Sequence, residues 1–189
     1  LSPTTTAWHR LGEVQLRQNE PAKAYQSLGK AADLNASPAK NASLMKLLGI
    51  AAFKVKRFDE AVRFLNQAAK LDKSADTLVN LSVAHQALND HQTAIQILAG
   101  VLGKFPTNAA ANLTAVTSLA YLNRREEAHR VGKKFIAFAA SNPKLKTTSE
   151  RISKMLAQLP LAGRAAQGKS ASPRRAPRAT ASPRVRAPA

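Results

Sequence analysis

Residues 7–34 read AWHRLGEVQLRQNEPAKAYQSLGKAADL, and this stretch decides the fold. Apolar residues recur at helical spacing on both sides of a short polar turn, Asn19–Glu20–Pro21. Pro21 suits the first turn of a helix, where its missing N–H would have no partner in any case. The stretch therefore predicts a helix around Thr6–Arg17, a turn, and a second helix around Ala22–Leu34.

The same pattern returns three more times along the chain. The residues that mark it are Ala24, Ala61, Ala94 and Ala128, which are 37, 33 and 34 residues apart. A period near 34 residues is typical of stacked helical hairpins and not of one globular core. We therefore predict an all-α fold with four repeat units, which span residues 4–37, 41–74, 75–107 and 108–140.

An amphipathic segment follows the fourth unit and predicts a last helix within residues 141–160. Thr147 and Glu150 have the spacing of a capping box at its start. One apolar stripe follows, made of Ile152, Met155, Leu156 and Leu159. Because a repeat array must cover its final apolar face, we expect this helix to cap the array, with a partner-binding helix as the alternative.

The C-terminal residues 161–189 differ sharply in composition from the rest. Ala, Pro, Ser and Arg dominate there, and acidic and aromatic residues are absent. Such a segment cannot bury enough apolar surface to offset its chain entropy, so we predict a disordered tail. Its basic residues are Arg164, Lys169, Arg174, Arg175, Arg178, Arg184 and Arg186.

The whole chain is strongly basic, with 29 Lys and Arg against 11 Asp and Glu and a net charge of +18. A field of this sign favours anionic partners such as nucleic acid, acidic protein or a membrane surface. One hypothesis is therefore that the tail tethers the protein to nucleic acid or to an anionic surface. Without aromatic residues to stack on bases, such binding would be salt-dependent and weakly sequence-selective. The alternative is a solvated linker.

The residues give no sign of catalysis, of a cofactor or of a metal. There is no cysteine, which excludes disulfides, thiol catalysis and cysteine-based zinc sites. No glycine-rich phosphate loop and no nucleophile elbow is present, and no apolar run is long enough to span a bilayer. The paired carboxylates Asp59–Glu60 and Glu126–Glu127 fall at helix starts, where they favour the helix dipole. We predict a non-enzymatic chain, with His91 and His129 on its outer, solvated side.

The repeated residues resemble a known family. Trp8, Leu11 and Gly12, followed by Ala24 and Leu28, have the spacing of a tetratricopeptide repeat. The second and third units repeat this spacing and the fourth keeps it more weakly, so that the resemblance covers about residues 4–140. It implies a right-handed superhelix of antiparallel hairpins, which acts as a protein-binding scaffold and needs no cofactor.

The resemblance also implies a concave groove lined by the first helix of each unit. In this sequence the groove residues would be His9, Glu13, Arg17, Lys46, Ile50, Lys54, Val79, Val83, Gln86, Leu113, Thr117 and Tyr121. The early part of this set is polar and partly basic, and the later part is apolar with Tyr121 as an aromatic anchor. Such a groove would fit an extended peptide or a partner helix with an acidic end and an apolar end. For Val79, Val83 and Leu113, simple packing is the alternative.

One branch of the family binds the carboxylate tail of heat-shock chaperones through a clamp of two lysines, two asparagines and one arginine. The corresponding positions in this sequence are His9, Glu13, Leu47, Asp76 and Asn80. The charges do not match, and Asp76 would repel a carboxylate. We therefore reject this function for the chain.

The first residues suggest a longer array. Leu1–Ser2–Pro3 resembles the end of a preceding repeat, so we expect the chain to be cut from a longer protein. A regulatory repeat segment of a larger enzyme, such as a sugar transferase, is therefore a further alternative. Self-association through the N-terminal face around Trp8 and Leu11 is also open. The alanine-rich, cysteine-free composition favours a bacterial source, which would place a soluble chain in the cytoplasm or the periplasm.

Overall fold

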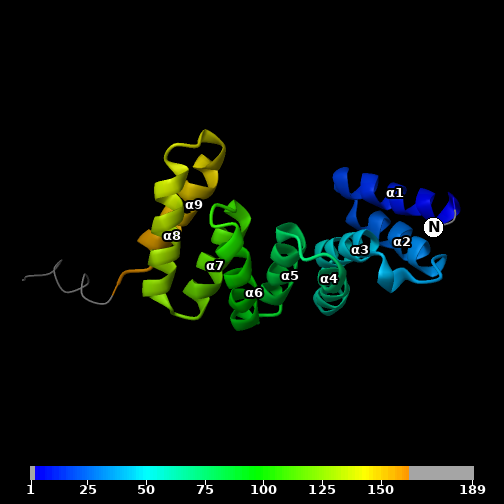
Figure 1. The fold of residues 1–189 in the computed structure, drawn as a ribbon, viewed down its shortest axis with the longest axis horizontal. Helices are drawn as coiled ribbons and strands as arrows, with labels where there is room; N and C mark the ends of the chain where they lie inside the picture. The colour runs from blue at the N-terminus through cyan, green and yellow to red at the C-terminus, as the bar shows by residue number, and fades with distance from the viewer. Residues whose placement is uncertain (1–2, 162–189) are drawn as a thin grey trace, which may run out of the picture.

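The computed structural model describes residues 3–161, and the tail that the sequence predicts to be disordered lies outside them. The regular structure of this part is helical, which confirms the all-α prediction (Figure 1). The α-helices are α1 (Pro3–Arg17), α2 (Pro21–Asp33), α3 (Ala42–Lys54), α4 (Phe58–Leu71), α5 (Ala75–Ala87), α6 (His91–Lys104), α7 (Ala109–Tyr121), α8 (Arg125–Ala139) and α9 (Lys146–Ala157). Short 3₁₀ turns, η1 (Pro38–Lys40) and η2 (Pro143–Leu145), precede α3 and α9.

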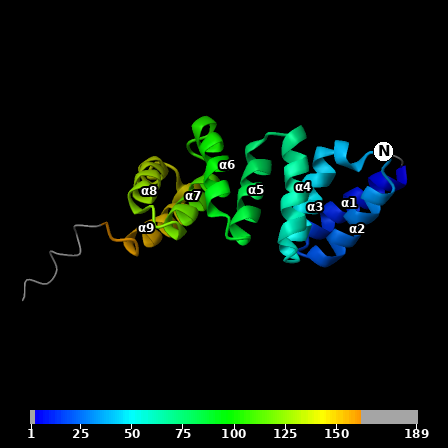
Figure 2. The same cartoon turned by 90° about the horizontal axis from the view of Figure 1, so that it is seen from below.

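Consecutive helices pair as hairpins, and neighbouring hairpins stack along the molecule (Figures 1 and 2). Each first helix also contacts the first helix of the next unit, from α1 and α3 through to α7 and α9. The second helices α2, α4, α6 and α8 make at most marginal contact with one another. First helices therefore lie closer together and line the concave side, which confirms the predicted superhelical array of hairpins.

The turn inside each hairpin is fixed by one residue in the left-handed region. Asn19, Lys56, Asn89 and Asn123 have φ between 56° and 65°. The N–H of the following residue donates to a carbonyl five residues earlier, as Asp90 N does to His85 O at 2.9 Å. This bond closes the last turn of each first helix. Asn tolerates the left-handed region better than other side chains, which explains its recurrence at this position.

Polar side chains cap the first helices after the first unit. The side chain of Asn41 accepts from Leu44 N at the start of α3, and Asn108 does the same for Ala111 N at the start of α7. Ser74 caps α5 in the same way. Each cap satisfies an N–H that the helix itself leaves without a partner. The first helices thus start at defined residues, which fixes what they present to the concave side.

Close helix crossings explain Gly12, Gly49 and Gly132, and they explain why the fourth unit departs from the repeat pattern. A Cβ on Gly49 of α3 would lie 2.5 Å from Leu65 Cγ of α4, and Gly12 meets Leu28 in the same way. In the fourth hairpin the glycine is on the second helix instead. A Cβ on Gly132 of α8 would lie 2.8 Å from Leu156 Cδ1 of α9. In the fourth unit the close contact between helices therefore lies between α8 and α9 and not between the two helices of one hairpin.

The last helix covers the end of the array, as predicted. Ile152 and Leu156 of α9 are buried in one cluster with Phe135 and Ala139 of α8. The predicted capping box, in contrast, is wrong. α9 begins at Lys146, and no side chain caps it. The chain enters α9 directly from η2, where Pro143 O accepts the N–H of Lys146.

Candidate functional site

The predicted groove residues come from the first helices α1, α3, α5 and α7. The structure gathers most of those on α3, α5 and α7 into two neighbouring cavities on the concave side. We call them the polar cavity, which contains Lys46, and the aromatic cavity, which contains Tyr121. The residues of α1 and Lys54 of α3 line neither cavity.

The polar cavity has a volume of about 270 Å³. Its lining residues are Lys46, Ile50, Asp76, Val79, Asn80, Asn108 and Ala110. Val79 is only 7 % exposed and packs with Leu98 and Val101, so packing is its main role. The ammonium of Lys46 and the carboxylate of Asp76 line the same space, which makes this cavity polar and not purely basic.

An ordered acidic turn stands beside the polar cavity. The carboxylate of Asp72 accepts from Ser74 Oγ at 2.7 Å and from Thr77 Oγ1 at 2.9 Å. These bonds hold the pKa of Asp72 below its ordinary value, with a smaller contribution from the charge of Lys46. The turn therefore stays ionised at neutral pH and fixes the start of α5.

The aromatic cavity has a volume of about 280 Å³. Its lining residues are Phe53, Val83, Gln86, Ala87, Asn89, His91, Thr117 and Tyr121. The ring of Tyr121 is 72 % exposed and stacks on His91, with 4.4 Å between centroids and 9° between ring planes. His91 itself is only 8 % exposed. A buried imidazole thus holds an exposed phenol ring in a fixed orientation beside an apolar wall, an arrangement suited to an apolar or aromatic side chain.

The polar residues Gln86 and Thr117 of the aromatic cavity form hydrogen bonds with other groups of the protein. Gln86 Nε2 donates to Thr114 O at 2.8 Å and to Ser118 Oγ at 2.6 Å, which ties α5 to α7. Thr117 Oγ1 donates to Leu113 O at 2.8 Å within α7. Leu113 packs against the cluster of buried residues around α7, α8 and α9. Binding in this cavity would therefore draw mainly on Phe53, Val83 and Tyr121.

The predicted residues of α1 interact with each other and with α3. Arg17 Nη2 lies 2.6 Å from Glu13 Oε1, so their charges are paired on the surface. His9 Nε2 lies 3.5 Å from Ser43 Oγ. Burial lowers the pKa of His9, and the charge of Glu13 only partly opposes this effect. The neutral imidazole gives no positive charge at pH 7, which leaves Lys46 and Lys54 as the basic groups of the groove.

The prediction that His91 and His129 face solvent on the outer side is wrong. His91 is the first residue of α6 and lies under Tyr121, while His129 Nε2 lies 2.6 Å from Leu159 O beside the end of α9. Comparing equivalent positions of the repeats would have predicted the burial of His91. Phe58 occupies the equivalent position two residues after the left-handed turn and contacts Phe53, so that this position packs inward. Sequence reasoning also missed Phe53 itself.

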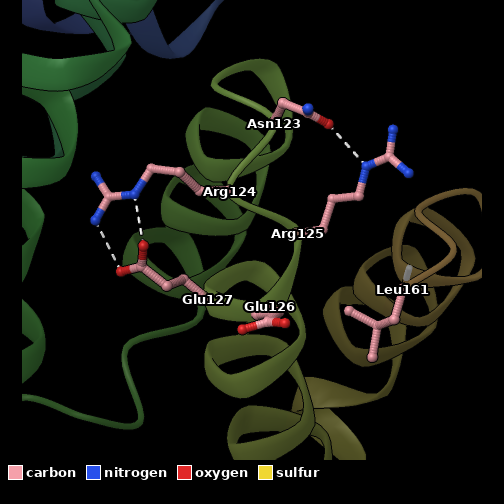
Figure 3. A pocket seen from close by; sticks show the side chains of 6 residues that line it. All are labelled: Asn123, Arg124, Arg125, Glu126, Glu127 and Leu161. Atoms are coloured by element: carbon pink, nitrogen blue, oxygen red, sulfur yellow. Dashed lines mark hydrogen bonds and ion pairs between the residues drawn. The ribbon is translucent and has the colours of Figure 1, made fainter. Parts of the chain in front are cut away.

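A further cavity of about 570 Å³ lies at the turn between α7 and α8 (Figure 3). Two of its charged residues, Arg124 and Glu127, are paired with each other. Arg124 donates to both carboxylate oxygens of Glu127, at 2.6 and 2.8 Å, and Arg125 Nε donates to Asn123 Oδ1 at 2.7 Å. The bond to Arg124 lowers the pKa of Glu127. The pairs of Arg124 with Glu127 and of Arg125 with Asn123 brace the turn.

Two properties of the described residues 3–161 bear on other functions. They contain no cluster of three or more His, Cys, Asp or Glu side chains that could hold a metal ion. None of their helices is both long and apolar enough to cross a membrane. At the N-terminal face, Leu11 and Val14 of α1 are exposed, while Lys30 Nζ lies 4.4 Å from the ring centroid of Trp8. Self-association through this face stays a prediction.

Comparison with known proteins agrees with the repeat pattern. A family model described as "Tetratricopeptide repeat" matches residues 76–108, which span α5 and α6. No curated protein matches the chain closely enough to count as a relative.

Solved structures share the fold at low sequence identity. MamA is 22 % identical, with a TM-score of 0.66 over 74 % of this chain and 75 % of that one. YrrB, titled a TPR protein with an unusual peptide-binding site, is 20 % identical, with a TM-score of 0.69 over 79 % and 74 %. The Arabidopsis OM64 TPR domain is 27 % identical, with a TM-score of 0.52 over 62 % and 98 %.

Proposed function

On the premise that this chain is an array of tetratricopeptide repeats, we propose that it is a non-enzymatic scaffold. It holds an extended segment of a partner protein in its concave groove and so helps to assemble a complex. Lys46 and Lys54 steer an acidic part of the segment toward the groove, and an apolar or aromatic side chain enters the aromatic cavity. The net charge of +18 accelerates the approach of an acidic segment.

The single observation that carries this proposal is the stacked pair of Tyr121 and His91. An aromatic ring that is 72 % exposed on the concave side has no role in the core, and the buried imidazole limits the entropy that the ring loses on binding. Aromatic residues held in this way are typical centres of binding energy. Phe53 and Val83 complete an apolar wall for the incoming side chain.

A displayed library of random peptides, selected on the full chain, supplies ligands for the test. We expect the selected peptides to share acidic residues at a fixed spacing from an aromatic or large aliphatic residue. Tyr121→Ala should weaken their binding by about tenfold or more, because most of the anchor's contact area is lost. Fluorescence anisotropy with a labelled peptide measures the change.

The matched control is Phe138→Ala on α8. Phe138 is an exposed aromatic residue that lines neither cavity of the groove. We expect its removal to leave affinity within about twofold, because it lies outside the contact. Equal losses in the two variants, or none in either, would show that the groove is not the peptide site.

The composition of residues 161–189 favours a second candidate function, an electrostatic tether to nucleic acid. This segment has seven basic residues and no acidic one. Binding of a single-stranded oligonucleotide should be lost in a chain that ends at Pro160, and it should fall steeply as salt rises. If the shortened chain binds equally well, the tail is not the tether.

A further inference from the structure

The side of α9 that faces away from α7 is covered by no second helix. The first helices α1, α3, α5 and α7 each pair with a second helix, and α9 packs on α7 and α8 in the place of a fifth first helix. Within residues 3–161 no helix follows it. Met155 approaches Thr117 of α7, whereas Ser153 and Ala157 line a cavity of about 610 Å³ between α8 and α9.

We call this space the end cavity, and its lining combines an apolar floor with a polar edge. The lining residues are His129, Lys133, Ile136, Ser153, Leu156, Ala157, Leu159, Pro160 and Leu161. The side chains of Ile136, Leu156 and Leu159 supply the floor. His129 Nε2 donates to Leu159 O, since a carbonyl oxygen only accepts, and its Nδ1 is buried without a hydrogen-bond partner. The floor is thus suited to the apolar stripe of a helix, and the edge to polar groups.

The sequence around the end cavity is basic, and Glu126 and Glu127 lie at its edge, where they line the adjoining cavity together with Leu161. Residues 129–161 contain a single acidic residue, Glu150. Their basic residues are Arg130, Lys133, Lys134, Lys144, Lys146, Arg151 and Lys154. The basic segment 162–189 follows directly on Leu161, which is itself part of the lining. The excess of basic residues in 129–161 therefore favours carboxylates near the end cavity.

We propose that the end cavity binds an acidic amphipathic helix of a partner protein, which packs against both α8 and α9. The apolar stripe of this helix covers Ile136, Leu156 and Leu159, and its carboxylates face Lys133. The charge selects this occupant over two others. A second copy of the chain, at +18, and the chain's own basic tail are both repelled by this surface. The apolar floor in turn favours a helix over a nucleic acid.

A synthetic helix of about 16 residues serves as the probe, with leucines at positions i, i+3, i+4 and i+7 and glutamates between them. Its labelled form is titrated with the full chain at about 0.15 M salt, where long-range charge effects are largely screened. A peptide of the same composition in scrambled order is the control. We expect the scrambled peptide to bind at least about tenfold more weakly, because it has no apolar stripe. Equal binding would overturn the proposal, since charge alone would then explain it.

Two pairs of variants locate the probe on the surface. Lys133→Glu should weaken binding about fivefold, while Lys134→Glu, which makes the same change of charge beside the cavity, should change it less than about twofold. Ala157→Trp fills the end cavity and should abolish binding, while Ala137→Trp on the exposed face of α8 should not. Equal effects within either pair would place the probe elsewhere and contradict the proposal.

The same variants and probe also test two other possible occupants of the end cavity, a second copy of the chain and a nucleic acid. Sedimentation of the full chain at increasing concentration shows whether a second copy binds, and a dimer that Ala157→Trp dissociates would overturn the acidic-helix assignment. An oligonucleotide that displaces the probe from the wild type would do so as well. Tyr121→Ala should leave binding of the probe unchanged, because the groove and the end cavity share no lining residue.

Discussion

Lys56 is the one residue that breaks the repeated turn within the described hairpins. It has φ of 65°, where the other three turns have Asn. A side chain without a local hydrogen bond to its backbone loses stability in this region. The turn at Lys56 is therefore expected to be less stable than the three turns that have Asn at this position.

Replacing Lys56 by Asn should stabilise the chain by about 0.5–1 kcal/mol, because Asn tolerates the left-handed region. The midpoint of unfolding in guanidinium chloride measures the gain. Lys70→Asn, the same replacement in the last turn of α4, is the control and should stabilise nothing. A shift of both midpoints in the same direction would mean that the turn geometry is not the cause.

Replacing glycine by alanine should lower the free energy of unfolding at Gly49 and raise it at Gly29. At Gly49 the new Cβ would lie 2.5 Å from Leu65 Cγ and 3.3 Å from Ala61 O, so we expect a loss of about 1–3 kcal/mol. At Gly29 nothing lies within 4 Å, and Gly29→Ala should gain about 0.5–1 kcal/mol through helix propensity. Thermal unfolding of both variants decides the matter, and a stabilised Gly49→Ala would contradict the packing at this crossing.

At the scale of elements, the start of α5 depends on an ionised carboxylate. The folded-state pKa of Asp72 lies below its unfolded value of about 3.9, because Ser74 and Thr77 donate hydrogen bonds to the ionised form. Its contribution to stability is therefore complete above about pH 4–5 and is lost as pH falls through the folded pKa. The melting temperature of Asp72→Asn should lie below that of the wild type at pH 7, and the difference should shrink as pH falls below the folded pKa of Asp72. A constant difference over that range would refute this role.

The sequence predicted the helices well and the site only in part. Helical spacing and the turn at Asn19 placed the first two helices to within three residues of their observed ends, because both are local signals. The contact between His91 and Tyr121 joins two hairpins, and no local pattern of His91 reveals it. The turn at Asn142 and η2, which replaced the capping box predicted at Thr147, is in contrast a local pattern that the sequence prediction overlooked. Contacts between units depend on the superhelix, which one repeat does not specify.

At the scale of the whole molecule, stability should be local, because each hairpin contacts only its neighbours. Ile152→Ala removes a fully buried side chain of α9 and should cost about 2–4 kcal/mol. Hydrogen exchange should accelerate in α8 and α9 and stay nearly unchanged in α1 and α2. Leu28→Ala in α2 should give the opposite distribution. Faster exchange along the whole chain in either variant would show a single cooperative unit instead.

The central claim is that a partner segment lies in the concave groove with its anchor at Tyr121. Photo-crosslinking of a selected peptide tests this most directly, with benzoylphenylalanine placed once at position 121 and once at position 138. Both positions hold exposed aromatic residues, one beside the aromatic cavity and one outside it. We expect strong crosslinking at position 121, through the apolar residue of the peptide, and none above background at position 138. Equal yields at both positions, or a yield at 138 alone, would contradict it.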